Sequence, residues 1–235
     1  MRGHKRDETG RCRASYAAAV SAEALIQSVT VRAAVPFVPE ISLATTTELY
    51  ALWDRTQREA PPFWAFPWAG GQGLARYVLD HPGVVRGRRV LDVASGSGLV
   101  AIAAAKAGAA SVTAADIDEL AVAAIGVNAA ANDVAGVITP RLFDFAAGWG
   151  DGWGDGLAGE ADVVLAADVF YQRELAALAL AFLTGAAAAG AEVLAADPGR
   201  AFVPRAALTP LATREVPVLS VLEDGESKTV TVYRL

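Results

Sequence analysis

The feature that most constrains the fold is a regular alternation of two kinds of segment from residue 87 onward. Short runs rich in β-branched residues alternate with longer alanine-rich runs of helical character. This alternation is typical of βαβ units, in which helices connect parallel strands and cover both faces of the sheet. The predicted strands are residues 89–93, 111–115, 138–143, 162–166 and 192–196, and the predicted helices are 73–79, 99–107, 118–131 and 172–184.

The C-terminal segment has a different character. Residues 215–222 and 228–233 are apolar, β-branched runs, and Asp224 and Gly225 in the connection between them favour a hairpin turn. We therefore expect an α/β fold: a doubly wound, Rossmann-like, mostly parallel seven-stranded sheet with a C-terminal antiparallel hairpin. Residues 148–159 contain six glycines interleaved with Trp and Asp, which predicts a surface loop.

The length and composition indicate one folded domain with an N-terminal extension. The chain has 235 residues, of which 54% are hydrophobic, enough for a single sizeable core. Residues 1–34 begin with a cluster of arginines and lysine and show no convincing signal-peptide pattern. We predict that residues 1–34 are a disordered extension and that residues 35–235 form the domain.

The charge distribution argues against a nucleic-acid partner. The formal net charge is -6, and because residues 1–34 carry six basic and three acidic side chains, the rest carries 14 basic and 23 acidic ones. A surface that binds phosphates needs the opposite balance. We expect no nucleic-acid partner, and we expect the acidic domain to favour a basic docking face on any protein partner.

The numbers of cysteines and histidines and the length of the apolar runs argue against disulfide-rich, metal-binding and membrane-spanning classes of protein. The single cysteine, Cys12, excludes a disulfide framework and favours a reducing cytoplasm. The two histidines, His4 and His81, are too far apart in sequence to form a metal site by themselves. The longest apolar stretch, residues 175–191, falls short of a membrane span. We expect a cytoplasmic monomer with no metal and no membrane association.

A glycine-rich turn follows the first predicted strand, in residues 90–99 (Val-Leu-Asp-Val-Ala-Ser-Gly-Ser-Gly-Leu). Glycines at such a turn let a ligand approach the backbone closely. The spacing alone fits a dinucleotide fingerprint as well as a methyl-donor site, so it leaves NAD and S-adenosylmethionine open. Asp92 favours S-adenosylmethionine, because a carboxylate there attracts a sulfonium and an ammonium and repels a pyrophosphate. The predicted cofactor contacts in the turn are Asp92, Ala94, Gly96 and Gly98.

Acidic residues end the next two predicted strands. Asp116 can accept hydrogen bonds from both hydroxyls of a ribose, and Asp118 is the predicted cap of the following helix. Asp144 ends the third strand and is a candidate acceptor for the exocyclic amine of adenine, with an ordinary solvated loop residue as the alternative. We therefore assign Asp116 and Asp144 to the cofactor site.

Asp168, Phe170 and Tyr171 follow the fourth predicted strand, which lies beside the first in a doubly wound sheet. Ligands bind at this switch in strand order. A carboxylate can orient an amine, and aromatic rings stabilise developing positive charge. These residues are candidate catalytic groups for an amine substrate, and a strand-end Asp followed by core aromatics fits the spacing equally well. Residues 62–72 hold four aromatics, which form either a pocket wall or a hydrophobic plug.

Several stretches together resemble one family. They are Val38-Pro39-Glu40-Ile41, Phe63-Trp64-Ala65, Trp68-x-Gly70-Gly71-Gln72, Arg76-Tyr77-x-Leu79-Asp80, Val85-Arg86-Gly87, Asp116-Ile117-Asp118, Asp168-x-Phe170-Tyr171 and Asp197-Pro198-Gly199-Arg200. With the glycine turn, residues 36–235 resemble the seven-β-strand S-adenosylmethionine-dependent methyltransferases, in particular the lysine methyltransferases of the electron-transfer-flavoprotein β subunit. Ala69, Ser97 and Gln172-Arg173 depart from that pattern.

The resemblance implies a class I S-adenosylmethionine-dependent methyltransferase domain over residues 35–235. It implies that Asp168, Phe170 and Tyr171 orient a target lysine, that the turn from Asp92 to Gly98 holds the methionine half of the cofactor, and that Asp116 holds the ribose. It also places Trp68, Ile117 and Ala167 beside the cofactor and makes the aromatic stretch a pocket wall. The departure at Gln172-Arg173 lies near the substrate.

The expected activity is protein-lysine N-methylation, with the electron-transfer flavoprotein β subunit as the protein substrate. Alternatives within the same chemistry are another protein, such as a ribosomal protein, and a small amine of the nicotinamide type. A non-catalytic cofactor-binding scaffold is a third reading, which the combination of Asp168, Phe170 and Tyr171 with the glycine turn argues against. A dehydrogenase would need a hydride-relay residue, and the two histidines are poorly placed for that role.

Overall fold

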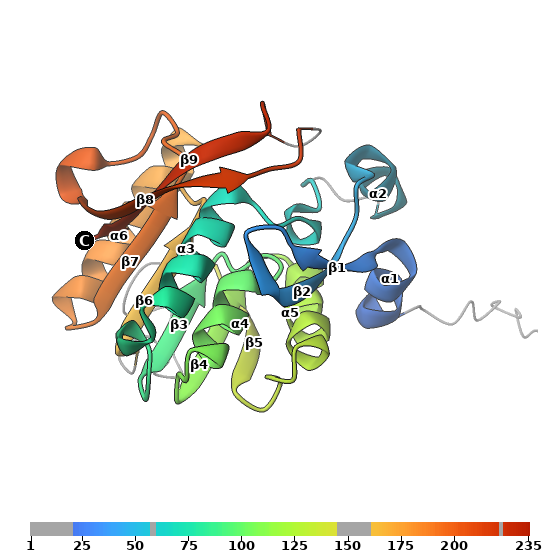
Figure 1. The fold of residues 1–235 in the computed structure, drawn as a ribbon, viewed down its shortest axis with the longest axis horizontal. Helices are drawn as coiled ribbons and strands as arrows, with labels where there is room; N and C mark the ends of the chain where they lie inside the picture. Colours follow the sequence, from blue (N-terminus) through green and yellow to red (C-terminus); the bar gives the residue numbers. More distant parts are fainter. Residues whose placement is uncertain (1–20, 57–59, 145–160, 221–222) are drawn as a thin grey trace, which may run out of the picture.

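The structure is a computed structural model, and it describes residues 21–56, 60–144, 161–220 and 223–235. Its main sheet has seven strands in the order β5-β4-β3-β6-β7-β9-β8 (Figure 1). The strands are β3 (Arg89–Val93), β4 (Ser111–Asp116), β5 (Ile138–Leu142), β6 (Val163–Ala167), β7 (Glu192–Asp197), β8 (Thr209–Pro217) and β9 (Ser227–Arg234). Strands β3 to β7 pair in parallel, and β9 runs antiparallel to both β7 and β8. The predicted fold class is confirmed.

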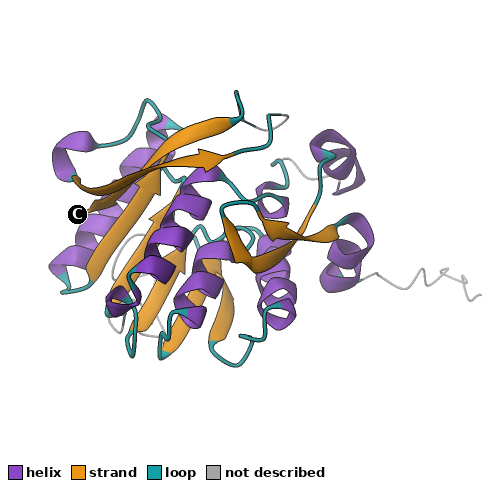
Figure 2. Ribbon diagram, viewed as in Figure 1, coloured by secondary structure: helices purple, strands orange, loops and turns teal. Residues whose placement is uncertain are grey.

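Helices cover both faces of this sheet (Figure 2). They are α3 (Ala69–Asp80), α4 (Leu99–Lys106), α5 (Glu119–Ala131) and α6 (Arg173–Ala188). Residues of α3, α4 and α5 share one core cluster with Val90 of β3, while α6 shares another with the next residue, Leu91. Successive side chains of a strand point to opposite faces, so the two clusters lie on the two sides of the sheet. The alanine-rich composition of α4 suits this packing, since six of its eight residues are buried.

The first strand of the C-terminal hairpin has different bounds from the predicted ones, whereas the second is within one residue of them. Strand β8 begins at Thr209 and ends at Pro217, where it pairs with Ser227, instead of covering residues 215–222. The reason is that β8 is an edge strand with most of its side chains exposed, so it needs no continuous apolar run. The predicted loop at residues 148–159 lies outside the described residues.

The N-terminal boundary also differs from the expectation. Helix α1 (Ala22–Val29) and strand β1 (Val31–Val35) are ordered, and β1 pairs antiparallel with β2 (Val38–Thr45) before α2 (Leu49–Thr56). The prediction of disorder is therefore corrected for residues 22–34, while residues 1–20 lie outside the described part. Ile26 explains the order, because this side chain is completely buried in a third core cluster that includes residues of α5.

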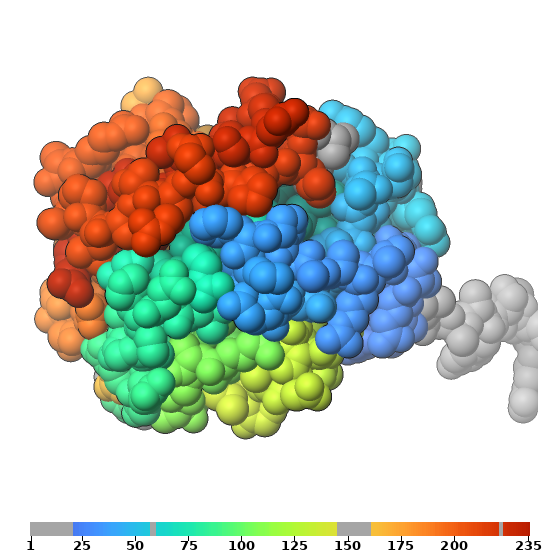
Figure 3. All heavy atoms as spheres, viewed as in Figure 1, coloured from blue at the N-terminus to red at the C-terminus, as the bar shows by residue number. Residues whose placement is uncertain are grey.

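Two asparagines of α5 and its C-cap attach β2 to the main domain. Asn128 accepts a hydrogen bond from the Ala44 backbone N–H (2.8 Å), and Asn132 accepts one from that of Ser42 (3.1 Å). Figure 3 shows the β1 and β2 segment packed between the C-terminal strands and α4 and α5 on one face of the molecule. In the described ranges, no helix is both long enough and apolar enough to cross a membrane.

Candidate active site

The glycine turn between β3 and α4 is built from left-handed backbone conformations. Ala94, Gly96 and Gly98 have φ values of 52°, 54° and 82°. Gly98 also lies close against α5, because a Cβ there would be in van der Waals contact with Ile125 at 3.4 Å. The buried amide of Asn128 donates to the carbonyl oxygen of Ser97 (2.8 Å), which fixes the turn against α5. Strand β3, the turn and α5 thus form one rigid support.

Asp92 holds the turn from inside. Its carboxylate is only 1% exposed, and its Oδ2 atom accepts hydrogen bonds from the Ser95 hydroxyl (2.5 Å) and the Ala101 backbone N–H (3.1 Å). Burial raises the pKa of Asp92 to about 7, and the charge of Asp116 contributes in the same direction. In this conformation Asp92 presents almost no surface to a ligand, so its direct action is to join the turn to α4.

Asp116 lies at the carboxyl end of β4, next to the turn. Its two carboxylate oxygens accept hydrogen bonds from the backbone N–H groups of Gly96 (2.8 Å) and Asp118 (3.0 Å). Burial raises its pKa despite these bonds. The carboxylate joins the two strand ends and keeps further lone pairs for hydroxyl donors. Asp118 caps α5 through the Leu120 N–H (2.9 Å), which confirms the predicted cap.

Two large apolar side chains stand exposed beside Asp116. Ile117 is 67% exposed, and Leu142, which pairs with Asp116 across β4 and β5, is 57% exposed. Exposed apolar side chains next to a carboxylate suit a nucleoside, which has apolar faces and hydroxyl groups. Leu142 was missed by the sequence analysis, since nothing in the sequence shows which side chain of an edge strand is exposed. Asp144 is exposed two residues after β5, and its contact with adenine stays a prediction.

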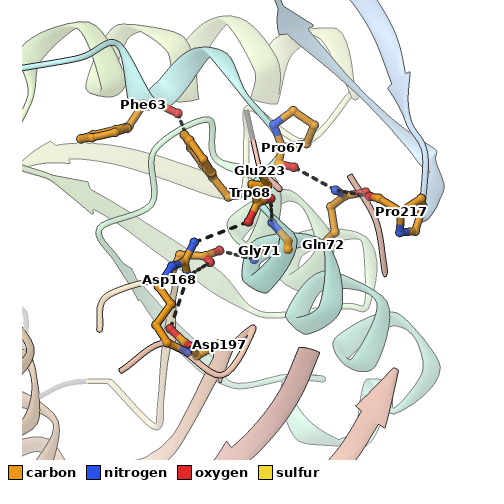
Figure 4. A network of polar contacts seen from close by, with 11 residues as sticks. Phe63, Pro67, Trp68, Gly71, Gln72, Asp168, Asp197, Pro217 and Glu223 are labelled. Atoms are coloured by element: carbon orange, nitrogen blue, oxygen red, sulfur yellow. Dashed lines mark hydrogen bonds and ion pairs between the residues drawn. The ribbon is translucent and has the colours of Figure 1, made fainter. Parts of the chain in front are cut away.

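Asp168 comes directly after Ala167, the half-buried last residue of β6, and its backbone is left-handed with a φ of 58°. The Oδ2 atom accepts a hydrogen bond from the Gly71 backbone N–H (2.8 Å) in the first turn of α3. The Oδ1 atom accepts one from the Arg200 guanidinium. Figure 4 shows Asp168 beside Gly71. Three segments distant in the sequence therefore meet at this carboxylate.

An aromatic group lies next to Asp168. The ring of Phe63 is 5.9 Å from that of Tyr171 and 5.8 Å from that of Trp68, measured between centroids, and Trp68 Nε1 donates to the Phe63 carbonyl oxygen (2.8 Å). Phe63 and Tyr171 are 40% and 41% exposed. Burial raises the pKa of the Tyr171 hydroxyl, and the negative charge of Asp116 raises it further. This effect indicates that the aromatic group lies near Asp116 and therefore near the glycine turn.

The aromatic stretch at residues 62–72 combines both of its predicted roles. Phe63 and Trp68 form a wall of the site with Tyr171, whereas Trp64 and Phe66 are 1% exposed and belong to the core. Phe170 is completely buried in the core cluster around α6. It therefore offers no surface to a substrate in this conformation and supports the Asp168 segment by packing.

The arrangement fits the predicted cofactor. Glycines at the turn leave the backbone open, Asp116 offers acceptor atoms for hydroxyls, and Ile117 and Leu142 offer apolar surface for a base. All of these groups lie at the carboxyl ends of β3, β4 and β5. Asp168 directly follows β6, which pairs with β3 where the strand order switches. Among the described residues, no cluster of three or more His, Cys, Asp or Glu forms a potential metal site.

Comparisons with known proteins agree with this geometry. Residues 77–168 match the family model of the ribosomal protein L11 methyltransferase (PrmA). The chain is 38% identical over 170 residues to the electron transfer flavoprotein beta subunit lysine methyltransferase of Xenopus laevis, covering 71% of this chain and 65% of the relative. The rat protein of the same name is 37% identical over 168 residues, which cover 69% of this chain and 62% of that protein. The chain thus spans less than two thirds of the length of these relatives.

A solved structure supports the fold. A candidate RNA methyltransferase from Pyrococcus horikoshii superposes with a TM-score of 0.50 at 19% identity, over 70% of this chain and 79% of that one. The strand order, the glycine turn and this likeness define a seven-β-strand, class I methyltransferase fold. Within that class, the chain resembles the lysine methyltransferases of the electron transfer flavoprotein beta subunit.

Proposed function

We propose that this protein is an S-adenosylmethionine-dependent protein-lysine N-methyltransferase, with the β subunit of the electron-transfer flavoprotein as its substrate. The observation that carries the proposal is the position of Asp168 and Tyr171 at the end of β6, beside the glycine turn and Asp116. A group that orients an amine and a group that holds a nucleoside then lie on one edge of the sheet. The relatives with the longest alignments carry the name of this activity.

Each group has a defined task in the proposed reaction. When bound, S-adenosylmethionine would supply an electrophilic methyl group on a sulfonium, with S-adenosylhomocysteine as the leaving group. Asp116 would bind the ribose hydroxyls, and Ile117 and Leu142 would cover the adenine. Asp168 accepts a hydrogen bond from the neutral substrate amine and turns the nitrogen lone pair toward the methyl carbon, and the methylated nitrogen then loses its surplus proton to solvent. The rings of Phe63 and Tyr171 exclude water around the lysine side chain and stabilise the positive charge of the methylated product.

Methylation of a ribosomal protein is the second candidate. The L11 methyltransferase of Porphyromonas gingivalis is 49% identical over 61 residues, but these are only 26% of this chain and 20% of that protein. The L11 family model ends at residue 168, before Tyr171, α6 and the C-terminal hairpin. The resemblance to that family therefore supports the proposed cofactor-binding residues more than it supports a ribosomal-protein substrate.

The experiment that tests the proposal is methyl transfer from methyl-tritiated S-adenosylmethionine. The purified chain is incubated with electron-transfer flavoprotein, ribosomal protein L11 and nicotinamide in separate reactions, with an Asp168→Asn variant as the control. We expect label on lysines of the flavoprotein β subunit, identified by mass spectrometry, and none with the variant. Label on L11 or nicotinamide alone would overturn the substrate, and failure to bind the cofactor by calorimetry would overturn the activity.

The acidic composition supports an electrostatic component of docking. The proposed partner presents a basic face around its target lysine, and the rate of association then falls as ionic strength rises. We also infer that the protein is cytoplasmic, because it has a single cysteine, and that it binds no nucleic acid, because its net charge is acidic. An activity that stays constant between low and high salt would contradict the electrostatic part.

A further inference from the structure

Arg200 lies among three carboxylates at the carboxyl edge of the sheet. They belong to Asp168, Asp197 and Glu223, which are labelled in Figure 4. Its Nη1 atom contacts Asp168 Oδ1 and lies 3.3 Å from Asp197 Oδ2, and its Nη2 atom lies 3.6 Å from Glu223 Oε1. The Arg200 backbone N–H also donates to Asp197 Oδ1 (2.7 Å), in the Asp-Pro-Gly-Arg turn after β7. The side chains of Asp197 and Glu223 are 0% and 9% exposed, so these charges are well shielded from water.

Two of the three carboxylates also hold the first turn of α3. Glu223 accepts a hydrogen bond from the Ala69 N–H (3.2 Å) and Asp168 accepts one from the Gly71 N–H (2.8 Å). These are N–H groups without partners inside the helix, and the helix dipole favours negative charge beside them. The Asp168 carboxylate is therefore held on one oxygen by α3 and on the other by Arg200, which fixes the plane of the carboxylate.

We propose that Arg200 is a positioning residue that sets the orientation of the Asp168 carboxylate toward the substrate amine. The inference rests on the proposed function. Arginine suits this role because its planar guanidinium reaches several carboxylates at once in a fixed geometry, which a lysine ammonium cannot do. Asp168 has a left-handed backbone, and a residue with a side chain keeps this conformation only where surrounding contacts hold it. Arg200 and Gly71 supply those contacts.

The cluster also retains a surplus of negative charge. One guanidinium faces three carboxylates: Asp168 directly after β6, Asp197 at the end of β7 and Glu223 before β9. Lys228 of β9 acts on Glu223 at longer range, and the α3 residues at the contact carry no charge. Burial raises the pKa of Asp197 and of Glu223, and Arg200 opposes that rise. Removal of Arg200 therefore favours protonated carboxyls in the cluster.

The kinetic test compares Arg200→Gln and Arg200→Lys with Arg214→Gln, an arginine exposed on β8. With saturating protein substrate, we expect Arg200→Gln to lower kcat by about tenfold or more, with a KM for S-adenosylmethionine within about twofold of the parent value. The acid limb of its pH–rate profile moves to higher pH. Arg200→Lys keeps the charge, so its acid limb stays near the parent position while kcat recovers in part. Equal kcat and pH profiles for all four proteins would overturn the inference.

A second readout is independent of turnover. The Gly71 backbone N–H donates to Asp168, so its amide resonance in an NMR spectrum reports the position of that carboxylate. In Arg200→Gln this resonance is expected to shift toward its position in Asp168→Asn, while Arg214→Gln leaves it unchanged. If the Gly71 resonance does not shift in folded Arg200→Gln protein, the positioning role is overturned even if methyl transfer is observed. Absence of methyl transfer with a shifted resonance would overturn the proposed function and leave the Arg200 contact supported.

Discussion

The carboxylate of Asp168 occupies the space that a side chain on Gly70 would need. A Cβ atom at Gly70 would lie 2.6 Å from Asp168 Oδ2, 2.7 Å from its Cγ and 2.8 Å from its Oδ1. Glycine at this position is therefore a requirement of the site and not of the helix, since its φ is not in the left-handed region. The close approach brings Asp168 to the N-terminus of α3, where the Gly71 N–H receives it.

We predict that Gly70→Ala displaces Asp168 and lowers the turnover of the folded protein by about tenfold or more. Gly73→Ala is the matched control, because a Cβ there would lie 2.6 Å from Val230 Cγ1 and would clash as severely without touching Asp168. Both variants lose stability through overpacking, by about 1–3 kcal/mol. Urea unfolding measures the loss of stability in each variant, and kcat measures the loss of turnover. An equal fall in kcat in both variants would show that the loss of turnover is a general structural effect.

Asp116 and Asp168 are predicted to separate cofactor binding from turnover. Asp116→Ala removes the acceptor for the ribose hydroxyls and weakens S-adenosylmethionine binding by about 1–3 kcal/mol. Asp168→Ala leaves this affinity nearly unchanged and abolishes methyl transfer, since Asp168 is assigned to the substrate amine and not to the cofactor. Isothermal titration calorimetry measures the first effect and a tritium-transfer assay the second. Equal losses of cofactor affinity in both variants would contradict this division.

The sequence predicted the elements that differ clearly in composition. Strands β3 to β7 and helices α4 to α6 are within a few residues of their expected bounds, because the strands are short runs rich in β-branched residues and the helices are longer alanine-rich runs. The β1–β2 hairpin was not predicted. Four of the five β1 residues are exposed, and the hairpin is attached through Asn128 and Asn132, whose partners are more than 80 positions away.

The site was predicted as a set of residues but not as a network. Asp168 was identified from its place after a strand, yet nothing in the sequence indicated that Gly71 and Arg200 bind its two oxygens, at separations of 97 and 32 residues. Asp92 was expected to face the cofactor, but its side chain is buried and accepts hydrogen bonds from Ser95 and Ala101 inside the turn. Contacts of this kind depend on tertiary packing, which periodicity and spacing do not encode.

The buried carboxyl of Asp92 predicts a pH dependence of stability. Its pKa is about 7 in the folded protein and 3.8 in an exposed chain, so between these values the folded state binds more protons than the unfolded state. The free energy of unfolding therefore falls as the pH rises through this window, by up to about 4 kcal/mol from this group. Asp116, Asp197 and Glu223 act in the same direction, since burial raises their pKa values.

The variant Asp92→Asn tests the assignment, because it removes the titration and keeps an acceptor oxygen. We expect the free energy of unfolding, measured in urea at pH 5, 6, 7 and 8, to fall less steeply for Asp92→Asn than for the parent protein. A matched substitution of an exposed acid, Glu174→Gln, should leave the slope unchanged. Parallel curves for Asp92→Asn and the parent would show that Asp92 does not titrate in this range.

Ala94 occupies a conformation that favours glycine, which leads to a prediction of increased stability. Its φ of 52° lies in the left-handed region, where a side chain with a Cβ costs about 1–2 kcal/mol. Ala94→Gly relieves this strain, and the greater freedom of glycine in the unfolded chain offsets part of the gain, so the net stabilisation is about 0.5–1 kcal/mol. The control is Ala130→Gly on the exposed side of α5, which should destabilise by about 1 kcal/mol. Opposite signs in urea unfolding would confirm the strained turn, whereas two destabilised variants would show that Ala94 is not strained.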